Sequence, residues 1–259
     1  MLIKTGFEMA LSFPQPTAVV LSLRIHPSRA DSVRGEEQLV VKPQMPVASY
    51  VDSFGNCCDR VFVTSGRLTV RSQALVEDSG QPDAQVWNAP EVPVQDLPHE
   101  VLIYLLASRY CEVDSELKDL AGKLFNDTPP GWPRVQAICD FVHRHLKFDY
   151  LQARGNRTAL EAYRERTGVC RDFTHSAITL CRCLNIPARY CTGYLGDIGV
   201  PPSADPMDFS AWFEAYLGGQ WFAFDPRNHI PRIGRILMAR GRDAVDAALT
   251  TSYGVSQLE

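Results

Sequence analysis

Residues 167–175 read TGVCRDFTH, a glycine turn that leads into a cysteine and then into a helical pattern. The apolar positions that follow recur at helical spacing, at Phe173, Ala177, Leu180, Cys181 and Leu184. We therefore expect Cys170 at or next to a helix N-terminus. There the free N–H groups and the helix dipole stabilise a thiolate, and can lower a cysteine pKa from about 8.5 towards neutrality. Cys170 is the candidate nucleophile, and the alternative is a buried packing cysteine.

The composition indicates a globular chain of one large or two ordinary domains. Its 259 residues carry a formal net charge of −4, and 45% of them are hydrophobic. No Lys/Arg run stands out to neutralise phosphates, which argues against a nucleic-acid groove. No apolar run reaches the roughly 18 residues of a membrane helix. The first ten residues carry Lys4 and Glu8 rather than a secretory apolar core, so we expect a cytoplasmic protein.

The cysteine pattern predicts free thiols. There are 8 cysteines, but in a chain of this length without a signal peptide they indicate reduced thiols rather than a disulfide framework. Cys57-Cys58 and Cys181-x-Cys183 lack the paired C-x-x-C spacing of a zinc site. The sequence contains no P-loop, no dinucleotide fingerprint and no acidic cluster dense enough for calcium. We therefore expect no metal and no cofactor.

The first part of the chain reads as β structure. Short runs rich in β-branched residues lie at 19–25, 60–64, 67–70 and 73–76, and Thr64-Ser65-Gly66-Arg67 predicts a hairpin between two of them. Residues 88–98 are proline-rich and form a natural boundary. We expect an antiparallel β-sandwich domain over residues 1–98 and a second domain over residues 99–259.

The second part reads as α+β. Helical periodicity covers residues 101–111, 115–125, 132–146 and 158–166, before the helix that begins near Cys170. Strand patterns follow at 186–195, 208–217 and 220–225. The charges in the tail, residues 236–254, indicate a solvated face. We expect helices packed on an antiparallel sheet.

The last two strands form a hairpin whose register the sequence predicts. The two-residue loop Gly218-Gly219 pairs Trp212 with Asp225, and Ser210 then lies diagonally from Asp225 on the same face, roughly 7–8 Å away at Cα. We expect that face to be directed at Cys170. The opposite, apolar face would carry Phe209, Ala211, Phe213 and Phe224. A histidine at 210 could be oriented by Asp225, which would complete a nucleophile, a base and an orienting acid.

Four ordered motifs carry a family resemblance: GVCRDF at 168–173, IPARY at 186–190, AWFE at 211–214 and WFAFD at 221–225. Together they resemble the core of the bacterial transglutaminase-like superfamily, and the N-terminal β region resembles the domain that accompanies this core. The resemblance implies a papain-like α+β fold with a Cys-His-Asp triad. On this sequence the nucleophile maps to Cys170 and the acid to Asp225, while the position of the histidine falls on Ser210.

Serine cannot serve as a base at neutral pH, so other histidines have to be considered. His175 lies five residues after Cys170, about 140° around a helix, and should point away from the sulfur. His229 is the stand-in. It follows Asp225 by four residues, beyond Pro226, and could return to the site.

Three function classes follow. The first is a cysteine hydrolase, a peptidase, amidase or transamidase that acts on amide or isopeptide bonds of a peptide or protein through a Cys170 thioester. The second is a catalytically impaired relative that binds a peptide or protein partner through the same cleft. The third is a structural or interaction protein in which Cys170 only packs.

Overall fold

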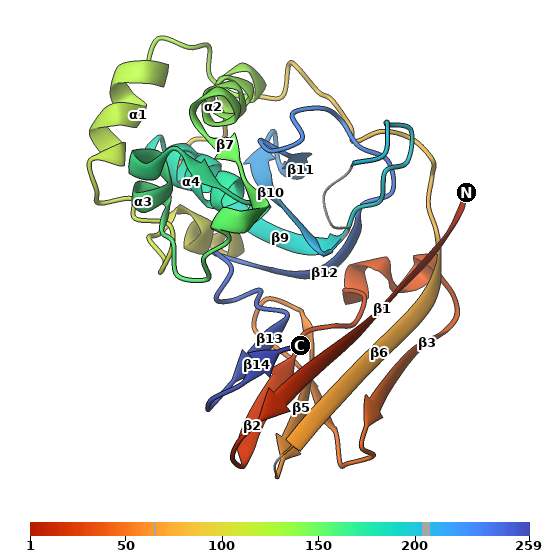
Figure 1. The fold of residues 1–259 in the computed structure, drawn as a ribbon. Helices are drawn as coiled ribbons and strands as arrows, with labels where there is room; N and C mark the ends of the chain where they lie inside the picture. Colours follow the sequence, from red (N-terminus) through yellow and green to blue (C-terminus); the bar gives the residue numbers. More distant parts are fainter. Residues whose placement is uncertain (65, 204–207) are drawn as a thin grey trace.

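The computed structural model describes residues 1–64, 66–203 and 208–259, and it contains a β-sandwich beside an α+β unit (Figure 1). The expected fold class is confirmed. One sheet of the sandwich has the order β14-β1-β6-β3, formed by Gln257–Leu258, Leu2–Phe13, Gly66–Glu77 and Val33–Lys42. The other has the order β13-β2-β5-β4, formed by Thr250–Ser252, Thr17–Leu21, Cys57–Val63 and Ala48–Val51. A 3₁₀ helix, η1 (Pro27–Ser32), follows β2.

The sandwich core follows from the period-two pattern of its strands. Along β6, Leu68 and Val70 are fully buried, whereas Arg67 and Arg71 on either side of them face solvent. These inward residues meet Val19 and Leu21 from β2 in one apolar cluster.

Two connections differ from the sequence-based prediction. The predicted hairpin at 64–67 does not form, because β5 pairs with β2 and β4 while β6 pairs with β1 and β3. The connection therefore passes from one sheet to the other; residue 65 lies outside the described residues. The tail returns to the sandwich, where β13 pairs with β2 and β14 with β1 (Figure 1). The division at residue 98 stays a prediction, with these two strands on the sandwich side.

The α+β unit begins with short 3₁₀ helices, η2 (Val94–Asp96) and η3 (His99–Leu105). The α-helix expected over 101–111 is thus a 3₁₀ turn, because the chain becomes extended at Leu106. The helices that follow are α1 (Leu117–Phe125), α2 (Trp132–His145), η4 (Tyr150–Gln152), α3 (Ala159–Glu165) and α4 (Cys170–Cys183). A short parallel pair, β7 (Lys147–Phe148) and β8 (Thr167–Gly168), lies just before α4.

The sheet of this unit has the order β11-β10-β9-β12, formed by Gln220–Phe224, Ser210–Leu217, Ala188–Tyr194 and Ile236–Gly241. The solvated face expected for the charges at 240–246 is wrong for Asp243, which is buried, while Arg242 pairs with Asp246. In β12, Ile236 and Met238 are buried in the clusters of the sandwich. One face of the sheet therefore lies against the sandwich, and the helices cover the other (Figure 1).

Helix α4 lies at the centre of the unit, between the sheet and the other helices (Figure 1). Every residue from Asp172 to Arg182 is buried, as expected for a helix enclosed on all sides. Its first residue, Cys170, lies at the margin of this core. No helix in the described part of the chain is long and apolar enough to cross a membrane.

Candidate active site

Cys170 is the first residue of α4, as the sequence predicts. The helix is capped by Asp172, whose carboxylate Oδ2 accepts the Val169 N–H at 2.9 Å. A Cβ atom at Gly168 would lie 2.6 Å from the Asp172 Cβ, so the turn before the cysteine requires glycine. The TGVCRD stretch thus places the thiol at a helix N-terminus by local chemistry alone.

The thiol opens into a cleft with a volume of about 190 Å³. One wall comes from the segment around β7 and η4, and the other from the loop that joins β9 to β10. The segment after β11 completes the rim. The described lining residues are Phe148, Tyr150, Ala153, Val169, Cys170, Leu195, Asp197, Ser203, Asp208, Ser210, Arg227, Asn228 and Arg232. Histidine is absent from this described lining.

The electrostatics of the thiol correct the prediction of a lowered pKa. Burial raises the pKa of Cys170 to about 11. Hydrogen bonds from the backbone N–H groups of Ala211 and Arg171 lower this pKa, but the negative charges of Asp208 and Asp225 raise it further, as burial does. At neutral pH the thiol is therefore protonated, because desolvation outweighs the helix N-terminus.

Ser210 lies in the same cleft as Cys170. It is the first residue of β10, opposite Gly193 of β9, and its carbonyl accepts the Thr192 hydroxyl at 2.9 Å. The side chain offers a hydroxyl and no group that titrates near neutrality.

The β10–β11 hairpin has the predicted register. Phe213 pairs with Phe224, so Trp212 lies opposite Asp225. Asp225 is engaged elsewhere, however: its carboxylate accepts the Asn228 N–H at 2.9 Å, the Asn228 Nδ2–H at 2.7 Å and the Arg235 Nη2–H at 3.0 Å. It is absent from the described lining of the cleft and borders a neighbouring cavity of about 110 Å³.

The predicted direction of the two faces of β10 was wrong. The apolar side chains of Ala211, Phe213 and Phe224 pack under α4, in the same core as Phe173. Trp212 packs on the opposite face, and strand alternation puts Asp225 on that face too. The sequence could not predict this, because both faces of the sheet are covered. Ser210 still reaches the cleft because it begins the strand, beside the start of α4.

His229 lies outside the described lining of the Cys170 cleft. Its Nε2 is 2.7 Å from Oδ1 of Asp140 on α2, and its ring stacks on His143 with centroids 4.5 Å apart. It borders the same neighbouring cavity as Asp225. The backbone of His229 is left-handed, with a φ of 58°, three residues after Pro226.

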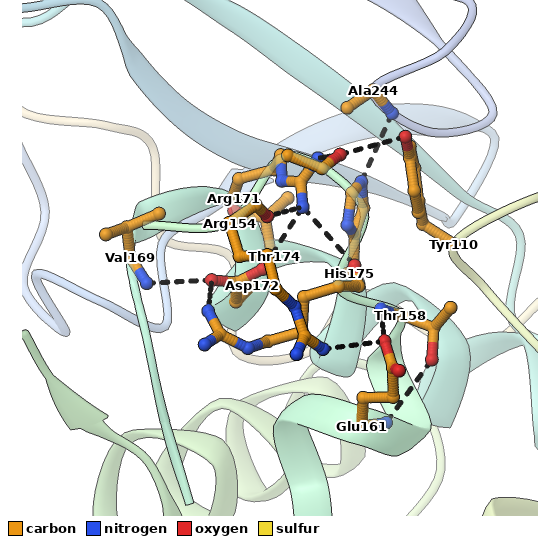
Figure 2. A network of polar contacts seen from close by, with 12 residues as sticks. Tyr110, Arg154, Thr158, Glu161, Val169, Arg171, Asp172, Thr174, His175 and Ala244 are labelled. Carbon is orange, nitrogen blue, oxygen red and sulfur yellow. Dashed lines mark hydrogen bonds and ion pairs between the residues drawn. The ribbon is translucent and has the colours of Figure 1, made fainter. Parts of the chain in front are cut away.

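His175 points away from the cleft, as expected from its helical position. It is fully buried, its ring stacks on Tyr110 at 5.1 Å, and its Nε2 accepts the Ala244 N–H at 3.1 Å (Figure 2). Burial holds the pKa of His175 well below its usual value, so it stays neutral.

Two further cleft residues were not identified from the sequence. The Tyr150 hydroxyl donates to Oδ2 of Asp208 at 2.9 Å, across the cleft from one wall to the other. This contact raises the pKa of Tyr150. Asp208 lies two residues before Ser210, a spacing that could have suggested a common side, but no sequence pattern identifies its partner 58 residues away.

Ion pairs shape the rim. Arg232 donates to Oδ1 of Asp197 at 3.0 Å and to Oδ1 of Asn228 at 2.9 Å. The Arg227 guanidinium lies 4.2 Å above the Phe148 ring. In the described ranges, no three His, Cys, Asp or Glu side chains gather as a metal site would require.

Comparison with known proteins identifies the family to which the core is similar. Residues 118–226, which include Cys170, Ser210 and Asp225, match the model of the Transglutaminase-like superfamily. The chain contains a transglutaminase-like core. A crystal structure of a candidate cysteine protease from Cytophaga hutchinsonii has a TM-score of 0.84 and 29% identity, over 100% of this chain and 90% of that one. The sandwich and the transglutaminase-like core thus occur together in that protein.

A second relative of this transglutaminase-like protein is the uncharacterized protein ML0607 of Mycobacterium leprae. The two are 33% identical over 191 residues, which is 70% of this chain and 66% of the relative. The match thus spans slightly less than two thirds of the length of that protein. The periplasmic domain of TgpA from Pseudomonas aeruginosa shares 16% identity at a TM-score of 0.43, over 85% of this chain and 87% of that one.

Proposed function

We propose that this transglutaminase-like protein binds an extended segment of a peptide or protein in the Cys170 cleft, and that it is a catalytically impaired member of its family. The observation that carries the proposal is the described lining of the cleft, which contains a thiol but no histidine to serve as its base. Burial raises the pKa of Cys170 to about 11. Ser210 occupies the position that the family triad gives to histidine, and His229 is held by Asp140. An activated nucleophile needs a neighbouring base.

The cleft has features that suit a peptide. Apolar side chains, among them Phe148 and Leu195, lie beside polar groups of both signs, so a backbone and its side chains would find partners along it. The eight cysteines are all free thiols. Oxidising compartments favour paired cysteines, which supports a cytoplasmic location as part of this proposal.

The second candidate is the hydrolase, which one observation favours: the backbone N–H groups of Ala211 and Arg171 act on the sulfur of Cys170. In that reaction the thiolate attacks the carbonyl carbon of an amide. The C–N bond breaks, the amine leaves with a proton, and water converts the thioester into a carboxylate and the free thiol. The same intermediate would transfer the acyl group to an amine in a transamidase.

The test uses unfolded casein as a general peptide ligand and iodoacetamide as a thiol reagent at pH 9. Site-resolved mass spectrometry follows Cys170, with Cys57 as an internal reference outside the cleft. We expect casein to protect Cys170 and leave Cys57 unchanged, with no casein cleavage at pH 7. Casein cleavage that disappears in Cys170→Ala would overturn the binding proposal in favour of hydrolysis. If casein is not cleaved and does not protect Cys170, both proposals are rejected.

A further inference from the structure

Two buried side chains behind the thiol form an ion pair of their own. Arg157 Nη1 donates to Oδ2 of Asp172 at 2.9 Å, and its Nε donates to Oε2 of Glu165 at 2.9 Å. The Arg157 and Asp172 side chains are 3% and 0% exposed. Oδ1 of Asp172 has no hydrogen-bond partner among the described residues. Arg171 Nη2 lies 3.5 Å from that Oδ1, so Arg157 makes the closer of two cationic contacts that compensate the charge of Asp172.

A second arginine connects the same helix and loop in the opposite direction, from α4 to the loop. Arg171, on α4, donates to the carbonyl of Gly155 at 2.6 Å and to that of Arg154 at 2.7 Å. Its guanidinium lies 4.7 Å above the Tyr110 ring, beside His175 (Figure 2). One arginine thus runs from the loop to the helix, and the other from the helix to the loop. We call Arg157, Arg171 and Asp172 the arginine clamp.

The clamp joins two parts of the cleft. On the helix it holds the backbone next to Cys170, because Arg171 follows Cys170 in the chain and Asp172 accepts the N–H of Val169, which precedes it (Figure 2). On the loop it holds the segment 152–157, which continues the wall that carries Tyr150 and Ala153. A change in the clamp would move both the backbone of the thiol and the opposing wall.

We propose that the arginine clamp is a positioning device of the Cys170 site: it fixes the start of α4 to the cleft wall, and Arg157 compensates the charge that Asp172 places behind the thiol. The inference requires Cys170 to be the functional thiol of the proposed cleft. It holds whether the cleft only binds a peptide or also cleaves it.

The electrostatic part of the proposal depends on the net charge of the Arg157–Asp172 pair. Asp172 lies two residues from Cys170, about 200° around the helix, so the two side chains do not touch and interact only through the field. With Arg157 in place, the charges of the pair cancel. The other charged or titratable groups around the thiol and the pair stay the same: Arg171, Glu165, Asp208, Asp225, Arg227, Tyr150 and Tyr190.

Single substitutions on the two sides of the pair should have opposite effects on the thiol. Arg157→Met leaves Asp172 with only the longer contact to Arg171, so more of its negative charge is uncompensated, which favours the protonated thiol and slows alkylation. Asp172→Asn removes that negative charge and leaves Arg157 paired with Glu165 alone, which favours the thiolate and accelerates alkylation. Below the pKa a shift of one unit changes the thiolate fraction about tenfold, and the opposing change in nucleophilicity leaves a net effect of about threefold. The double variant should return close to the wild-type rate.

The experiment measures the rate of iodoacetamide modification at Cys170 from pH 7 to 10, by site-resolved mass spectrometry. A role limited to structure predicts that both single variants loosen the site and shift the rate in the same direction. That result, or an unchanged pH profile in both, would overturn the proposal. The control is Arg164→Met on the neighbouring α3, which breaks an exposed ion pair with Glu116 at the start of α1 and should leave the profile unchanged.

A conservative variant covers the case in which Arg157→Met does not fold. Arg157→Lys keeps the charge, so its profile should match the wild type while Asp172→Asn is faster; a Lys variant as fast as Asp172→Asn would reject the electrostatic role. No peptide is present in this assay. Failure of the clamp proposal is therefore distinguishable from failure of the proposed peptide binding, which casein protection tests separately.

Discussion

Ser210→His should introduce the histidine base that the described lining of the cleft lacks. Ser210 and Cys170 line the same cavity of about 190 Å³, which has room for an imidazole. A neutral histidine there could accept the thiol proton and later return a proton to the leaving group. The imidazolium would also stabilise the thiolate and so oppose the burial that raises the pKa of Cys170 to about 11.

The size of the gain depends on Asp225. A positioned base typically contributes about 10²–10⁴-fold in rate. Asp225 can orient the new ring only with the acceptor capacity it has left, because its carboxylate already accepts two hydrogen bonds from Asn228 and one from Arg235. The Arg235 charge also weakens the pull of Asp225 on an imidazolium. We therefore expect the lower end of the range, about 10²-fold.

The assay is hydrolysis of p-nitrophenyl acetate at pH 7.5, which reports on a nucleophilic thiol without knowledge of the natural substrate. Cys170→Ala in the Ser210→His background must abolish the gain. Ser210→Gln, which adds bulk but no base, is the matched control and should stay at the wild-type rate. A wild type that is already fast, with no gain from histidine, would refute the view that position 210 lacks the base.

Three other predictions concern the rest of the molecule. His229→Ala should leave Cys170 alkylation within twofold of wild type and lower stability by about 1 kcal/mol, because the ring bonds Asp140 rather than the thiol; a large loss of Cys170 reactivity would return His229 to the site. Removal of residues 250–259 should destabilise the fold by on the order of 3 kcal/mol in urea unfolding, since β13 and β14 lose their ladders; an unchanged midpoint would contradict their role. Burial lowers the pKa of His26 to about 4. The unfolded chain binds more protons between that value and about 6.5, so stability should fall by up to ~3 kcal/mol as the pH is lowered through this window, and His26→Gln should flatten the curve.

Local chemistry accounts for what the sequence predicts well. The start of α4 depends on a glycine, a capping aspartate and an apolar stripe within a few residues, and the hairpin register depends on the loop Gly218-Gly219. Each of these signals acts over short range. The position of Cys170 and the pairing of Trp212 with Asp225 were therefore accessible from the sequence alone.

The remaining features depend on long-range packing. The burial of β12 comes from the sandwich, which covers Met238, and no local pattern reveals that. The pKa of Cys170 rises because of burial that only the folded cleft creates. His229 has a left-handed backbone conformation, and its ring bonds Asp140, 89 residues earlier in the chain. A triad assigned by sequence spacing could not anticipate these contacts.

The returning tail has a consequence for synthesis in the cell. Strands β1 and β2 precede the transglutaminase-like core in the chain, yet their partners β14 and β13 follow it (Figure 1). Until residues 250–258 are translated, both sheets expose backbone edges that these strands do not yet pair. The sandwich can close only after the transglutaminase-like core has been translated, so nascent chains should depend on chaperones until then. Slow translation of residues 250–258 would lengthen that exposed period.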